Sequence, residues 1–193
     1  MATRESVRLD GSAPAGIQAA PETIISTGAA KFLAVFRVVL GFEFLWAFVD
    51  KTFGFGYATP AERAWINGGS PTKGFLSRVA VGPFEATFHS IAGAAWADWL
   101  FMAGLLGIGI ALVFGIGLRI AAVSGTLMMV LMWAAEWPLD KLTSAGEPSM
   151  STNPIVDYHI IYALALIALA VTYAGNTWGL GRLPFVQRNR WLI

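Results

Sequence analysis

Three side chains that can exchange protons stand within or beside long apolar stretches of this sequence. Glu43 lies inside one apolar run, Glu136 ends a second, and His159 lies at the start of a third. A charge at bilayer depth costs roughly 2.5–3.5 kcal/mol, so such residues face the protein interior and commonly mark a function. Carboxylates and imidazole are suited to general acid–base chemistry. We predict that Glu43, Glu136 and His159 are the catalytic residues of one pocket.

Aromatic side chains accompany these three groups. Phe44, Trp46, Trp133 and Trp137 are expected to form an apolar wall, with Tyr158 as a further binding residue at the same membrane interface. A flat apolar slot with titratable groups at its ends is what a quinone ring and its two carbonyls require. The same residue types also suit a small transporter with a proton relay.

The composition favours a membrane protein. Hydrophobic residues make up 56% of the 193 residues, charged residues 13%, and the mean hydropathy is +0.61. Soluble domains of this size carry about 25% charged residues and cannot hide so much apolar surface. The net charge of +1 argues against a nucleic-acid partner.

Metal-based and cysteine-based redox centres held by the chain itself are not expected. The sequence has no cysteine, which excludes disulfides, iron–sulfur clusters and a covalent persulfide. It has two histidines, and His89 falls in a predicted loop, so we expect neither a bis-histidine haem nor a metal site.

Four apolar stretches predict an all-α integral membrane protein, a bundle of four transmembrane helices. The spans are expected near 29–50, 97–116, 118–138 and 155–175, inside a membrane domain of residues 28–182. Asn153 and Pro154 are interpreted as the N-cap and first residue of the last helix. Small residues at every fourth position of the second span, Ala103, Gly107, Ala111 and Gly115, are interpreted as a helix-packing face.

Three segments lie outside these spans. Residues 1–27 are predicted to be a flexible polar tail, and residues 183–193 a basic C-terminal tail. The long first outer loop, from Lys51 to Trp96, is expected either to carry short amphipathic helices on the membrane surface or to pack on the helix ends. Lysines and arginines are more frequent on the side of the termini, which predicts cytoplasmic termini in a multi-pass protein of the cell membrane.

Two short sequence patterns resemble the DoxX/DoxD family. The first runs from Arg37 through Leu40-Gly41 and Phe44-Leu45 to Lys51, and the second is Asn153-Pro-Ile-Val-Asp-Tyr-His159 before an apolar helix. The resemblance covers about residues 30–182. Phe48 and Val49 depart from it, because the family has a small residue shortly before the lysine.

The resemblance implies a membrane subunit of a quinone-linked oxidoreductase, such as one that oxidises thiosulfate beside a partner redox subunit. Quinone is then the expected cofactor. By position, Arg37, Lys51 and His159 become the main candidates, and Arg37 or Lys51 attracts a small anion if it faces the pocket. Snorkelling to the cytoplasmic headgroups is the alternative for Arg37.

Three functions therefore stay open. The first is the quinone-linked oxidoreductase subunit, the second a non-catalytic anchoring or assembly subunit of a redox complex, and the third a small proton-coupled carrier. The sequence leaves open whether the chain is an enzyme by itself.

Overall fold

The structure, a computed structural model, describes residues 25–193 and is all-helical in that range. It contains seven α-helices and four short 3₁₀ helices there, with no β-strand. The predicted all-α class is therefore confirmed for these residues. Residues 1–24 of the predicted polar tail lie outside the described residues.

Three helices are long and apolar enough to cross a membrane. They are α1 (Thr27–Phe53), α4 (Ala95–Phe114) and α5 (Leu118–Glu136), with 27, 20 and 19 residues. At about 1.5 Å per residue each reaches about 28 Å or more, close to the thickness of the hydrocarbon core. The fourth apolar helix, α6 (Tyr158–Val171), has 14 residues and is shorter than the predicted span of 155–175.

Short elements fill the connections. Between α1 and α4 lie η1 (Ala61–Arg63), η2 (Trp65–Asn67), α2 (Lys73–Leu76) and α3 (Glu85–Ile91); after α6 come η3 (Ala174–Asn176), η4 (Leu180–Arg182) and α7 (Pro184–Gln187). The segment predicted as a C-terminal tail is attached to the helices. Val186 is buried, and the Leu192 carbonyl accepts a 2.7 Å hydrogen bond from Gly117 N–H.

The start of α6 differs from the sequence-based prediction. Asp157, not Asn153, is the N-cap, and its carboxylate accepts a hydrogen bond from Ile160 N–H. The Asn153 side-chain oxygen instead accepts the N–H groups of Ile155 and Val156 at 2.9 and 2.8 Å. This local bonding stabilises a turn, so the helix begins four residues later than Pro154.

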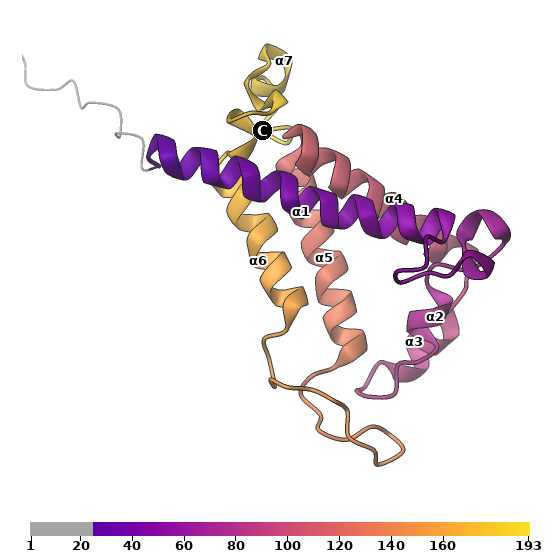
Figure 1. Cartoon of the computed structure of the whole chain (residues 1–193). Helices are drawn as coiled ribbons and strands as arrows, with labels where there is room; N and C mark the ends of the chain where they lie inside the picture. The colour runs from indigo at the N-terminus through magenta and orange to yellow at the C-terminus, as the bar shows by residue number, and fades with distance from the viewer. Residues whose placement is uncertain (1–24) are drawn as a thin grey trace, which may run out of the picture.

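The long helices lie as two pairs. α1 packs along α4 and α5 packs along α6, while α4 also contacts α5. Figure 1 shows the two pairs diverging from the end that carries the C-terminal segment, with α2 and α3 on the side where they are far apart. The arrangement is thus more open than the compact bundle that the sequence predicts.

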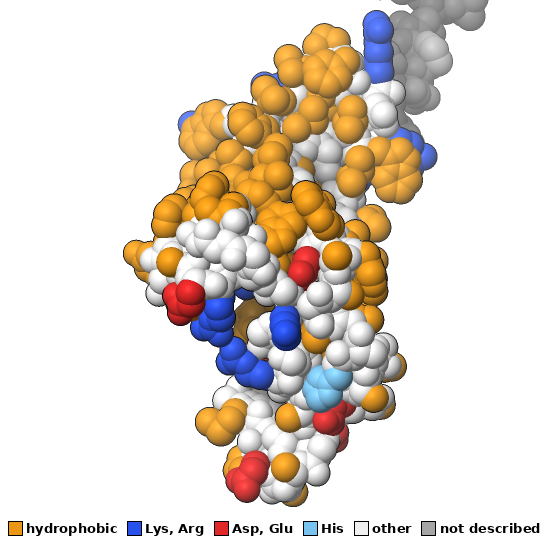
Figure 2. Space-filling view, turned by 90° about the vertical axis from the view of Figure 1, so that its right-hand side faces the viewer, with side chains coloured by type: hydrophobic (Ala, Val, Ile, Leu, Met, Phe, Trp, Pro, Cys, Tyr) orange, Lys and Arg blue, Asp and Glu red, His pale blue; other side chains and the backbone are white. Residues whose placement is uncertain are grey.

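Apolar side chains occupy both the interior and the outer faces of these helices. Leu40, Ile108 and Leu166 belong to the buried core, whereas Val39 on α1 and Leu164 on α6 are 61% exposed. Figure 2 shows hydrophobic side chains gathered over the upper part of one face, with charged groups around a hollow below them. Outward apolar surface on helices of spanning length identifies a multi-pass membrane protein.

The small-residue interpretation for α4 fits Ala111 and Gly115, which pack inside the molecule, but not the first two residues of the repeat. Ala103 and Gly107 are exposed, and no atom lies near the position of a Cβ at Gly107. The close approach of α1 occurs at Gly109, where a Cβ would lie 2.6 Å from Leu45 Cγ and 3.0 Å from the Leu45 backbone nitrogen. Gly109 falls outside the four-residue repeat, so the repeat did not reveal it.

We predict that Gly109→Val separates α1 from α4 and that Gly107→Val does not. Overpacking a close helix contact costs about 1–3 kcal/mol, whereas an exposed substitution changes stability by about 0.5 kcal/mol or less. Reversible unfolding of the two purified variants in mixed detergent micelles measures the difference. Equal stability of both variants would contradict the packing of α1 on α4.

Candidate functional site

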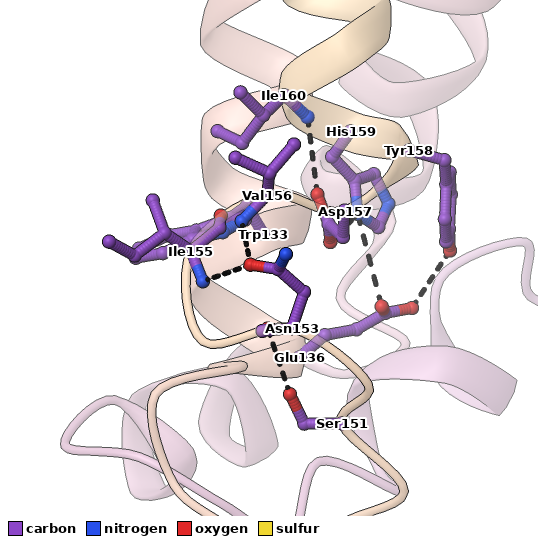
Figure 3. A network of polar contacts seen from close by, with 10 residues as sticks. All are labelled: Trp133, Glu136, Ser151, Asn153, Ile155, Val156, Asp157, Tyr158, His159 and Ile160. Atoms are coloured by element: carbon purple, nitrogen blue, oxygen red, sulfur yellow. Dashed lines mark hydrogen bonds and ion pairs between the residues drawn. The ribbon is translucent and has the colours of Figure 1, made fainter.

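A polar cluster forms where α5 ends and α6 begins. Glu136 is the last residue of α5, Asp157 caps α6, and Tyr158 and His159 are the first residues of α6. The antiparallel packing of these helices brings residues that are far apart in the sequence to one place (Figure 3). We call Glu136, Asp157, Tyr158 and His159 the acid–base cluster.

The cluster is connected by hydrogen bonds. His159 Nδ1 lies 2.8 Å from Asp157 Oδ2 and 3.9 Å from Glu136 Oε2. The Tyr158 hydroxyl donates a 2.9 Å hydrogen bond to Glu136 Oε1. The His159 side chain is fully buried, while those of Asp157 and Glu136 are 17% and 37% exposed. Glu136 thus connects a buried imidazole with the surface.

The neighbours of His159 determine which ring nitrogen carries the proton. A carboxylate oxygen at hydrogen-bond distance favours a proton on Nδ1. The neutral ring then presents a lone pair at Nε2, which is buried and has no hydrogen-bond partner among the described residues. Glu136 Oε2 lies 3.9 Å from the same Nδ1 atom. The cluster therefore places a buried imidazole, the carboxylate that fixes its tautomer and a partly exposed carboxylate within reach of one another.

A pocket of about 500 Å³ opens beside the cluster. Glu136, Asp157 and Tyr158 line one side, and Phe75 and Val79 are among the apolar residues that line another. Its volume lies in the range of small-molecule sites, and a few polar groups on an apolar wall are typical of them. The geometry provides a site where a bound molecule can exchange protons with Glu136 or Tyr158.

The same cluster offers ligands that a metal ion can use. One ligand atom from each of Glu136, Asp157 and His159 lies within 4.8 Å of the others. One imidazole and two carboxylates suit divalent transition metals. The sequence analysis expects no metal site, because the chain has two histidines and one of them falls in a predicted loop.

The structure does not bring Glu43 or Trp46 into this cluster. Glu43 is exposed on α1, which packs on α4 rather than on the α5–α6 pair. Trp46 stacks with Phe42 and Phe55, with ring centroids 6.0 Å apart in each pair, along the outer side of α1. The predicted acid–base and aromatic residues are therefore divided between the two helix pairs.

Trp133 and Trp137 lie near the cluster without lining its pocket. The Trp133 indole N–H donates a 2.8 Å hydrogen bond to the Ile155 carbonyl, which holds the loop before α6. The Trp137 ring packs against Gly82 and lies 6.0 Å from the ring of Phe84. Both tryptophans attach loops to the end of α5.

Arg37 is fully buried at the opposite end of the molecule. Its guanidinium donates hydrogen bonds to the carbonyls of Leu112 and Val113, at the end of α4, and of Thr177 and Trp178, after α6. Gly115 allows this approach, because a Cβ there would lie 2.8 Å from Arg37 Nη1. Arg37 satisfies backbone carbonyls, and the structure places it neither at the headgroups nor beside the acid–base cluster.

Lys51 lies at the other end of α1 and lines a second hollow. Its Nζ is 5.9 Å from the centroid of the Phe101 ring. The sequence analysis placed His159, Glu136 and Tyr158 at one site, and these residues do meet, but it did not include Asp157 among the site residues. Its position two residues before His159 was the signal for the direct contact.

Comparison of the chain with protein-family models, with curated proteins and with solved structures found no match. The acid–base cluster and the fold are thus the observations on which a function must be based.

We predict that Arg37→Ala prevents stable folding, whereas Arg119→Ala does not. A buried carbonyl left without a donor costs about 1–3 kcal/mol, and Arg37 donates to four carbonyls, one in a buried contact and three in part-buried contacts. Arg119 donates only to the Tyr173 hydroxyl, at 3.1 Å in an exposed position. Yield of monodisperse protein and thermal unfolding measure the effect. A stable Arg37→Ala variant that has lost anion or quinone binding would instead favour a binding role.

Proposed function

We propose that the chain is a membrane subunit of a quinone-linked oxidoreductase, with the quinone bound beside the acid–base cluster. The observation that carries this proposal is a buried histidine, hydrogen-bonded to one carboxylate and 3.9 Å from a second, with both carboxylates lining a pocket of about 500 Å³. The resemblance to the DoxX/DoxD family supports the same function. On that basis we propose thiosulfate as the electron donor and a redox subunit as the partner.

Each residue of the cluster has a role in this proposal. A quinone that takes up two electrons also takes up two protons at its carbonyl oxygens. Tyr158 holds the Glu136 carboxylate through its hydroxyl hydrogen bond, and Glu136 transfers protons between the pocket and His159. Asp157 holds His159 in the tautomer with its proton on Nδ1. The electrons come from a donor oxidised by the partner subunit or at a separate site.

The membrane placement follows from the apolar helices. We propose four crossings, with α6 and its flanking residues as the fourth, because α6 packs along the membrane-length α5 and exposes Ile161, Leu164 and Val171. The loop from α1 to α4, with α2 and α3, then lies on the outer face, and both termini are cytoplasmic by the distribution of lysine and arginine.

We expect His159→Ala or Glu136→Gln to lower the rate of quinone reduction by about 10²-fold or more, the usual contribution of a general acid–base group. Thiosulfate-dependent reduction of decylubiquinone, by the complex purified with its partner subunit, measures this rate. His89→Asn and Glu147→Gln are the matched controls, since neither residue belongs to the cluster.

Full activity in both cluster variants would overturn the catalytic role and leave a non-catalytic anchoring subunit. Normal binding of a quinone analogue with slow turnover would locate the defect in proton transfer, as the proposal requires.

Reporter fusions test the topology. A reporter active only in the cytoplasm is expected to be active at the C-terminus and inactive when inserted after Ser149, in the loop between α5 and α6. An inactive C-terminal fusion beside an active loop insertion would invert the orientation, and activity at both positions would exclude α6 as a crossing.

A further inference from the structure

A second hollow, of about 670 Å³, lies within the loop that joins α1 to α4. Four cationic side chains line it, and Figure 2 shows lysine and arginine side chains around the hollow on that face. We call Lys51, Arg63, Lys73 and Arg78 the basic pocket. Glu62 is the one carboxylate among its lining residues.

Asp50 is one of two buried acidic residues near the basic pocket, and backbone N–H groups of the loop already bind its carboxylate. Asp50 is buried, and its carboxylate accepts hydrogen bonds from the N–H groups of Tyr57, Ala58 and Thr59 at 3.4, 3.0 and 2.8 Å. These bonds hold the beginning of the loop against the end of α1. Asp50 therefore defines the shape of the pocket, and its oxygens are already engaged.

Asp98 is the second buried acidic residue near the basic pocket, and it attaches the middle of the loop to α4. Asp98, in the first turn of α4, accepts hydrogen bonds at Oδ1 from Ser70 Oγ, Thr72 N–H and Thr72 Oγ1, at 2.8, 2.9 and 2.6 Å. The chain just before Lys73 is thereby fixed on α4. The cations are thus presented by a loop that two buried carboxylates attach to the long helices.

The cations of the basic pocket form no ion pair among the described residues. None of the four has a carboxylate within salt-bridge distance or a side-chain hydrogen bond in residues 25–193, and Lys51 Nζ lies 5.9 Å from the centroid of the Phe101 ring. Like charges gathered around one hollow repel each other unless an anion enters. Arginine guanidinium groups match the oxygens of phosphate and sulfate in geometry as well as in charge.

We infer that the basic pocket binds a tetrahedral oxyanion of the phosphate or sulfate type, either as a free anion or as the headgroup of an anionic lipid. Arg78, Phe75 and Gly74 also line the pocket of the acid–base cluster, so the anion would lie across α2 from that cluster. Binding of the anion requires no quinone and is independent of the proposed redox function.

Calorimetric titration of the purified full-length protein with inorganic phosphate and with sulfate, in neutral detergent at low salt, tests the free anion. We expect saturable binding that weakens about tenfold or more in Lys73→Gln/Arg78→Gln, the loss expected for one charge-assisted hydrogen bond. Lys141→Gln removes an exposed cation from the same side of the protein without altering either pocket, and its affinity should equal that of the unchanged protein.

Nanodiscs distinguish the lipid source. If the lipid headgroup is the ligand, the protein binds phosphate in discs of phosphatidylcholine but not in discs that contain phosphatidylglycerol. In that case the double variant also co-purifies with less phosphatidylglycerol than the unchanged protein. If the anion is free, phosphate binding is the same in both discs. Arg63→Gln is a second variant, should the first fold poorly. Equal anion and lipid binding by the unchanged protein and both variants, with circular dichroism showing helix content intact, would overturn the inference.

Discussion

A charged group inside a membrane protein must find its hydrogen-bond partners within the protein, because lipid offers none. Three buried groups in this chain illustrate how that constraint organises the structure. Arg37 donates hydrogen bonds to carbonyls at the end of α4 and after α6. Asp50 and Asp98 accept hydrogen bonds from N–H groups of the loop between α1 and α4. The side chains that look chemically reactive in the sequence thus include some that bind backbone groups and hold the fold together.

Polar and charged groups without hydrogen-bond or ion-pair partners among the described residues mark the two candidate binding sites. The acid–base cluster keeps an unpartnered His159 Nε2 and a partly exposed Glu136, and the basic pocket keeps four unpaired cations within the described residues. The two sites adjoin through α2 and Arg78. This separation of engaged from available charges is the reason for assigning Arg37 to the architecture and His159 to the chemistry.

Hydropathy predicted the long helices closely, because length and apolar content determine a membrane span directly. The bounds of α4 and α5 differ from the predicted spans by two residues at most at either end.

The pairing of the helices could not be predicted from hydropathy. A helix that is apolar all round gives no sign of which face meets a neighbour, so the close contact of α1 with α4 at Gly109 was not predicted. His159 and Glu136 could be matched because both stand at helix ends on one side of the membrane, whereas Asp50 and Asp98 act through backbone groups that no residue pattern reveals.

The guanidinium of Arg37 also has a mechanical consequence. It ties α1 and α4 to the non-helical segment after α6, at the end from which the two helix pairs diverge. Because the two helix pairs are held together at this end, their relative motion is smallest here and largest at their far ends. Any change in the angle between the pairs would therefore alter the spacing between the first loop and the α5–α6 connection, where Gly82 meets Trp137 and Ser144 N–H bonds to the Ala80 carbonyl.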